Sequence, residues 1–124
     1  MPAKLVWKKK PESEDLDAAL NFLSLICTPG KAKKLIGALQ DAKPVERAAK
    51  DLLRASGLPL LVRDEPHVDD DLKNIHKGKP LAPVLLVRGD FQKRMRLVVA
   101  DGYHRICAVC YFDENAPIAC HIAD

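Results

Sequence analysis

The sequence of 124 residues has no long hydrophobic run and no repetition. No stretch of about 18 or more consecutive apolar residues occurs, so the sequence predicts no membrane-spanning helix and no membrane partner. The lysine-rich N-terminus, residues 1–11, is not followed by an apolar stretch, which argues against a secretory signal. Without internal repeats or low-complexity tracts, the length fits one domain, 1–124. We expect a soluble, cytoplasmic protein.

Cysteines are few and lack the pattern of a metal site. The four are Cys27, Cys107, Cys110 and Cys120. Cys120 and His121 are neighbours in a predicted strand and point to opposite faces, so they cannot easily join Cys107 and Cys110 around a zinc ion. The cysteines are therefore interpreted as reduced core thiols, and neither zinc nor haem is expected.

The net charge of +3 is too small to indicate a nucleic-acid-binding protein by itself. Residues 31–54 are locally basic, with seven basic side chains against three acidic ones. The basic residues are Lys31, Lys33, Lys34, Lys43, Arg47, Lys50 and Arg54. The stripe is interpreted either as a solvated helix face or as a surface that meets phosphates, those of DNA included.

Residues 1–57 are interpreted as a basic arm followed by a helical layer. Ser13 is the expected N-cap of a first helix, and Thr28–Pro29 marks the start of a second. Pro44 is expected to open a third helix, which ends at Gly57. This half carries no catalytic motif.

Residues 58–124 mix strands and helices, which predicts an α+β fold. Segment 58–62 is expected to be an edge strand or an extended link, and a polar loop follows at 63–67. Asp69 or Asp70 is expected to cap a short helix that ends at Gly78. The remaining predicted elements are strands 83–87, 97–100 and 118–122, a hairpin loop at 88–94 and a helix at 104–113.

One turn in this half carries several groups suited to chemistry. A buried strand is predicted to end at Ala100, and Asp101–Arg105 leads into a helix. The first N–H groups of a helix lack internal partners and, with the helix dipole, attract anions. Gly102 lets the backbone approach a ligand closely, and Arg105 offers a charged fork suited to phosphate oxygens. Val98–Arg105 is therefore predicted to bind the phosphates of a nucleotide or another phosphorylated ligand.

Two side chains of the turn are candidates for a catalytic role. His104 could act as an acid or a hydrogen-bond donor, and Asp101 could hold Mg²⁺ or orient a neighbour. His67 lies in the preceding polar loop, where it could face the ligand. The alternative is a polar turn in which Asp101 pairs with Arg105 for structural reasons alone.

The segments Leu81–Val87 and Val98–Ala108 together resemble the ParB/sulfiredoxin superfamily, and the resemblance covers roughly residues 58–124. Its pattern is a proline-hydrophobic strand, a second strand, a Gly-x-x-Arg turn and a helix with an early alanine. It implies a ParB/sulfiredoxin-like core preceded by an N-terminal helical layer. It also implies that the turn binds a nucleotide, which is CTP in ParB proteins and ATP in sulfiredoxins. The corresponding residues are Gly102, Tyr103, His104 and Arg105, with Asp101 beside them.

The sequence departs from the superfamily in three ways. Sulfiredoxins carry their catalytic cysteine between the glycine and the histidine, where this chain has Tyr103, so sulfiredoxin chemistry is not expected. ParB proteins continue into helix-turn-helix and dimerisation domains, whereas this sequence ends at Asp124. Free-serine kinases of this fold use a glutamate from a loop before the core, and Glu65 is the candidate here. Lys79 is interpreted either as a phosphate contact or as a solvated lysine.

Two functions follow from these patterns. The first is a nucleotide-binding protein that uses ATP or CTP with Mg²⁺, as a nucleotide hydrolase, a nuclease or a small-molecule kinase. The second is a non-catalytic module whose helices dock a partner or DNA. An oligomer is compatible with either function.

Overall fold

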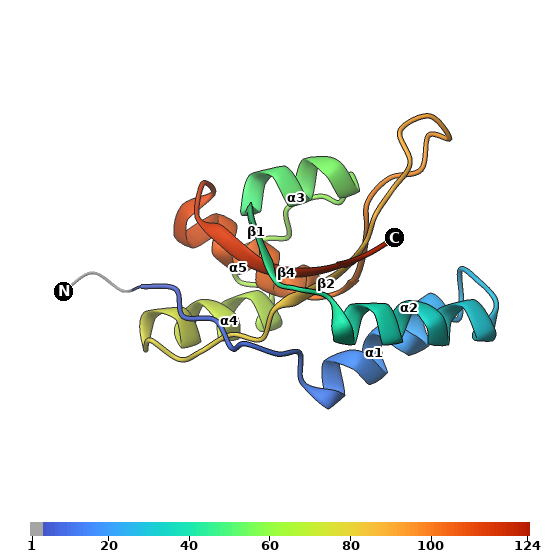
Figure 1. Ribbon diagram of the computed structural model, residues 1–124. Helices are drawn as coiled ribbons and strands as arrows, with labels where there is room; N and C mark the ends of the chain where they lie inside the picture. The colour runs from blue at the N-terminus through green and yellow to red at the C-terminus, as the bar shows by residue number, and fades with distance from the viewer. Residues whose placement is uncertain (1–3) are drawn as a thin grey trace.

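The structure is a computed structural model that describes residues 4–124, and it places a four-stranded sheet between two groups of helices (Figure 1). The helices are α1 (Ser13–Leu23), α2 (Pro29–Asp41), α3 (Ala49–Ser56), α4 (Pro66–His76) and α5 (Tyr103–Asp113). The strands are β1 (Val45–Ala48), β2 (Val84–Val87), β3 (Val98–Asp101) and β4 (Pro117–Ala123). The predicted α+β class is confirmed.

The sheet is mixed, with strand order β1-β4-β2-β3. Strand β2 is parallel to β4, while β1 pairs antiparallel with β4 and β3 pairs antiparallel with β2. The strand-turn-helix unit at residues 98–113 lies where the sequence predicts it, within one residue at each boundary. Because β3 is an edge strand, the turn that follows it lies at an edge of the sheet.

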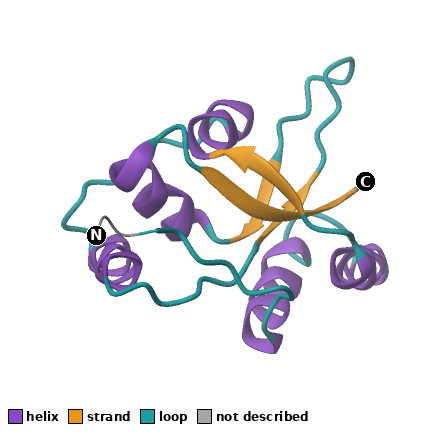
Figure 2. Cartoon of the chain, turned by 60° about the vertical axis from the view of Figure 1, so that its left-hand side comes forward, coloured by secondary structure: helices purple, strands orange, loops and turns teal. Residues whose placement is uncertain are grey.

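Helices lie on both faces of the sheet (Figure 2), and each face buries its own hydrophobic cluster. Along β2, Val84 and Leu86 pack with α3, α4 and α5, while Leu85 packs with α1 and α2. This alternation is the period of two expected of a strand buried on both faces. Helices α1 and α2 therefore form the predicted N-terminal layer, and α3 lies on the other face.

The prediction that a helix begins at Pro44 is wrong, because Val45–Ala48 forms strand β1. The register pairs Val45 with Cys120 and Ala48 with Pro117. Pro44 has no N–H to donate and Val45 is β-branched. Both residues are therefore compatible with the start of an edge strand. Pairing with β4 outweighs the local helical pattern, and the helix begins only at Ala49. Strand β1 also joins residues before 57 to the sheet of the second half.

Helix α4 begins earlier than expected. Its N-cap is Glu65, whose side chain accepts a hydrogen bond from the Val68 amide at 2.9 Å, and Pro66 occupies the first helical position. The expected caps at Asp69 and Asp70 are wrong, because both residues lie inside the helix. The first helix differs by one residue, since its N-cap is Glu12 and Ser13 is already helical.

The links around the core are also ordered by hydrogen bonds. The segment expected to be a loose arm exchanges backbone hydrogen bonds with Leu81 through Val6 and Lys8, both at 2.8 Å. Residues 58–62 form an extended link outside the sheet, and α5 holds them through Tyr103 and Tyr111. Within residues 4–124, no helix combines the length and apolar character needed to cross a membrane.

Candidate functional site

The turn between β3 and α5 has the backbone expected of an anion-binding turn. Gly102 has a φ of 108°, in the left-handed region that favours glycine. A Cβ there would lie 2.6 Å from Val84 Cγ1, so the site also needs a residue without a side chain. The first helical hydrogen bond runs from the Ile106 amide to the Gly102 carbonyl. No side chain among the described residues caps α5, so its first amides remain free to bind a ligand.

Most hydrogen-bond donors of Arg105 are bonded to acceptors within the protein. Its Nη1 donates to the carbonyls of Ala82 and Pro83 at 2.7 and 3.1 Å. Its Nη2 donates to Asp101 Oδ2 at 3.0 Å and to Asp15 Oδ1 at 3.2 Å. A guanidinium has five N–H donors, so these four bonds leave Nε–H without a partner among the described residues. Arg105 therefore fixes the turn, and a ligand would find little of its fork available.

Asp101 and Asp15 share this guanidinium. Burial raises the pKa of Asp101 to about 6, with a further rise from Asp15 that opposes the lowering by Arg105. Asp15 Oδ2 is buried and has no hydrogen-bond partner in the described part of the chain. The structural pairing of Asp101 with Arg105 is thus present. Asp15 lies 90 residues before Arg105 in the sequence, so no motif connects it with the turn and sequence patterns could not identify it as a partner of Arg105.

The start of α4 lies against the start of α5 and brings a second set of groups. Glu65 Oε1 is 2.9 Å from His67 Nδ1, and Glu65 Oε2 is 3.8 Å from His104 Nε2. The hydrogen bond from His67 lowers the pKa of Glu65 to about 2, and Glu65 in turn raises the pKa of His67. The two imidazole rings lie 4.7 Å apart between centroids. Glu65 therefore carries a full negative charge at neutral pH between two imidazoles.

A cavity of about 270 Å³ opens where these groups meet. It is lined by His67, Asp70, Asp71, Asp101, Gly102, His104 and Arg105. Burial raises the pKa of Asp71, against the lowering effect of Arg105 and His104. Three carboxyl groups against one guanidinium would repel a bare phosphate, whereas a divalent cation would balance them. The cavity thus fits a cation, or a phosphate that arrives with one.

Two of the predicted binding residues lie outside this cavity. The Tyr103 hydroxyl donates to the Pro59 carbonyl and so holds the 58–62 link. Lys79 is exposed and follows the C-terminal end of α4, while the turn lies at the N-terminal end of that helix. The structure brings Asp101, Gly102, His104 and Arg105 together with Glu65 and His67.

The cysteines behave as core thiols, as the sequence predicts. All four are free, and Cys107 and Cys120 are buried. Burial raises the pKa of Cys110 to about 11 and that of Cys120 to about 12. These thiols stay protonated at neutral pH, so neither redox nor metal chemistry is indicated for the Cys107–Cys110 pair.

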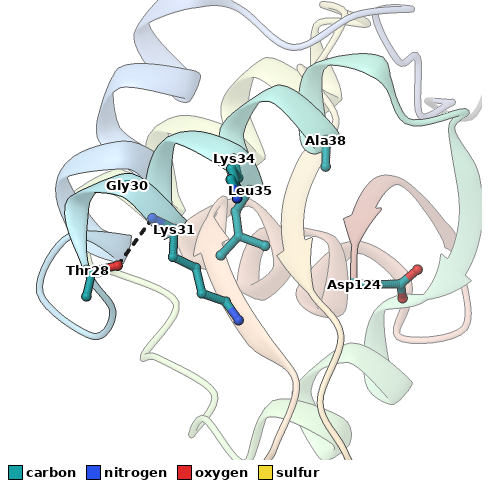
Figure 3. A pocket seen from close by; sticks show the side chains of 7 residues that line it. All are labelled: Thr28, Gly30, Lys31, Lys34, Leu35, Ala38 and Asp124. Atoms are coloured by element: carbon teal, nitrogen blue, oxygen red, sulfur yellow. Dashed lines mark hydrogen bonds between the residues drawn. The ribbon is translucent and has the colours of Figure 1, made fainter.

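A larger cavity, about 570 Å³, lies at the N-terminus of α2 (Figure 3). Lys31 and Lys34 line it opposite Asp124. Here the Thr28 hydroxyl already accepts a hydrogen bond from the Lys31 amide, so the helix end is capped. The amides at this end of α2 are therefore less available to a ligand than those of α5.

Comparisons of the chain with protein-family models, curated proteins and solved structures found no match. The resemblance of residues 58–124 to the ParB/sulfiredoxin superfamily therefore remains a hypothesis carried by the sequence motif.

Proposed function

We propose that the chain binds a phosphorylated ligand, a nucleotide being the leading class, together with a divalent cation in the cavity at the start of α5. The observation that carries this is an uncapped helix N-terminus that opens into a cavity lined by carboxylates and imidazoles. The α5 amides would bind phosphate oxygens, and the carboxylates would hold the cation.

Roles within this site follow from the contacts of each residue. His104 is half-exposed at the cavity, where its imidazole can contact a phosphate oxygen or the cation. Arg105 would act mainly by holding Asp101 and the turn in place. If the ligand is turned over, the chemistry that fits is phosphoryl transfer or phosphodiester hydrolysis.

Thermal unfolding in the presence of ATP, CTP or pyrophosphate, each with and without Mg²⁺ or Mn²⁺, tests this proposal. A ligand that binds only the folded chain stabilises it by about 2.7 kcal/mol at roughly 100 times its Kd. We expect the rise to need the cation and to shrink in His104→Ala and Asp70→Asn. His76→Ala is the matched control, because His76 is exposed at the far end of α4. No stabilisation by any of these ligands would overturn the proposal.

A second candidate is a module that binds DNA, and the hairpin between β2 and β3 favours it. This hairpin extends away from the body of the molecule (Figures 1 and 2). Phe91 in it is 96% exposed and Met95 is 57% exposed. Its basic side chains, all exposed, are Arg88, Lys93, Arg94 and Arg96. Fluorescence anisotropy with duplex DNA tests this candidate, and Lys93→Gln with Arg94→Gln should weaken binding and its salt dependence.

A further inference from the structure

Three potential metal ligands meet where α4 and α5 begin. They are Glu65, His67 and His104, and each offers one donor atom that lies within 4.8 Å of the other two. Ligand atoms bound to a tetrahedral ion at about 2.0–2.1 Å are separated by roughly 3.3 Å. Glu65 Oε1 is 2.9 Å from His67 Nδ1 and Glu65 Oε2 is 3.8 Å from His104 Nε2, so the two carboxylate contacts lie on either side of that value. Small rotations of the side chains would therefore bring all three onto one ion.

The carboxylate of this triad is already oriented. Glu65 Oε2 accepts the hydrogen bond from the Val68 amide as the N-cap of α4. Its side chain is 23% exposed, less than those of His67 and His104. The cap bond acts as an outer-shell contact that holds a ligand in position, while Oε1 remains directed toward His67 and Oε2 also lies near His104.

The triad differs from the carboxylate site first expected for Mg²⁺. Asp101 is bonded to Arg105, and it contributes no donor to the triad. Mg²⁺ prefers oxygen ligands, whereas two imidazoles with one carboxylate suit zinc, iron and related transition ions. His67 and His104 also line the acidic cavity together with Asp70 and Asp71, so an ion held by the triad would border that cavity.

We infer that Glu65, His67 and His104 form a binding site for a divalent transition-metal ion, with coordination positions left open toward the cavity. The ion balances the carboxylates of the lining and presents an electrophilic face beside the α5 amides. The site refines the proposed function, and it rests on that function for the second ligand, a phosphate oxygen on the open positions.

The first test is metal binding to the full chain, freed of metal with a chelator and without any nucleotide. Titration calorimetry with Zn²⁺, and with Mn²⁺ and Mg²⁺ for comparison, should give one Zn²⁺ per chain and weaker or no binding of Mg²⁺. We expect His67→Gln and His104→Gln each to weaken Zn²⁺ binding by more than about tenfold. His76→Gln should bind as the unmodified chain does. Zn²⁺ binding that is absent, or unchanged in both triad variants, overturns the inference.

Co²⁺ absorption spectra distinguish this triad from the thiols. A site of two imidazoles and a carboxylate gives visible d–d bands without the near-ultraviolet charge-transfer band of thiolate ligands. A thiolate charge-transfer band that is present in the unmodified chain and absent in Cys110→Ser overturns the assignment to the triad.

The two proposals fail separately. If nucleotides bind with Mg²⁺ but His67→Gln changes neither that binding nor Zn²⁺ binding, the triad inference is wrong and the proposed function stands. If Zn²⁺ binds through the triad but neither pyrophosphate nor nucleotide adds stability, the metal site stands and the proposed function is wrong.

Discussion

The Arg105 guanidinium donates to the Asp15 carboxylate at 3.2 Å, across 90 residues of sequence. Asp15 lies in the first turn of α1 and Arg105 in the first turn of α5, so the contact joins the two helical layers at one edge of the sheet. Both side chains are largely buried, with 14% of Arg105 and 18% of Asp15 exposed. The motif residue that suggests phosphate binding is thus also a structural connection.

Replacing Arg105 with alanine should destabilise the fold strongly. Two buried carboxylates and two backbone carbonyls would lose their donor, and removing one partner of a buried ion pair costs about 3–5 kcal/mol. Urea unfolding measures this loss. Arg54→Ala is the control, because Arg54 pairs with Asp51 while 82% exposed, and it should change stability by less than about 0.5 kcal/mol. Equal stabilities for the two variants would mean that Arg105 is not structural.

Gly102→Ala should also be destabilising, for reasons of backbone and space. Its φ of 108° strains any other residue by about 1–3 kcal/mol, and the added Cβ would lie 2.9 Å from Val84 Cβ. Gly37→Ala is a matched control inside α2, where nothing lies within 4 Å of the new Cβ. That change should stabilise the chain by about 0.5–1 kcal/mol. Thermal unfolding of the two variants should therefore shift in opposite directions.

The strand-turn-helix unit could be predicted from sequence because its signals are local. Apolar β-branched residues, then Asp101–Gly102, then a helical pattern fix β3 and α5 within a few residues. The sequence pattern predicts too late a start for helix α4 because its N-cap, Glu65, is not among the usual N-cap residues. Pro66 at the first helical position, next to an acidic residue, was the available signal.

The composition of the site could not be predicted in the same way, because it depends on tertiary contacts. Glu65 and His104 are far apart in sequence, and only the packing of α4 against α5 brings them together. Strand β1 was missed for a related reason, since its pairing with β4 outweighs the local pattern around Pro44. Sequence reasoning therefore identifies the turn, while the set of groups around it requires the fold.

The two tyrosines of α5 should act on the 58–62 link and not on a ligand. Tyr111 donates to the Leu61 carbonyl at 2.7 Å, and Tyr103 donates to the Pro59 carbonyl. Tyr111→Phe should lower the free energy of unfolding by about 1 kcal/mol and speed amide hydrogen exchange around the link. Tyr103→Phe should lower it by less, because the Tyr103 hydrogen bond is exposed. Nucleotide affinity should be the same in Tyr103→Phe as in the unmodified chain. A loss of affinity in that variant would place the Tyr103 hydroxyl on the ligand.

The carboxyl of Asp101 should titrate near pH 6, and Asp15 should be one reason. A carboxyl whose pKa is higher in the folded chain than in the unfolded chain holds its proton longer when folded, so its contribution to stability falls as pH rises from about 4 to about 6. In Asp15→Asn the repulsion from a second carboxylate is gone, so the pKa of Asp101 should fall and this slope should flatten. Carboxyl ¹³C NMR titration measures the pKa, and urea unfolding across the same pH range measures the slope. Asp17→Asn, an exposed change on the same helix, should leave both unchanged. If Asp101 keeps its pKa in Asp15→Asn, burial alone raises it, and the two carboxyls do not act as a pair.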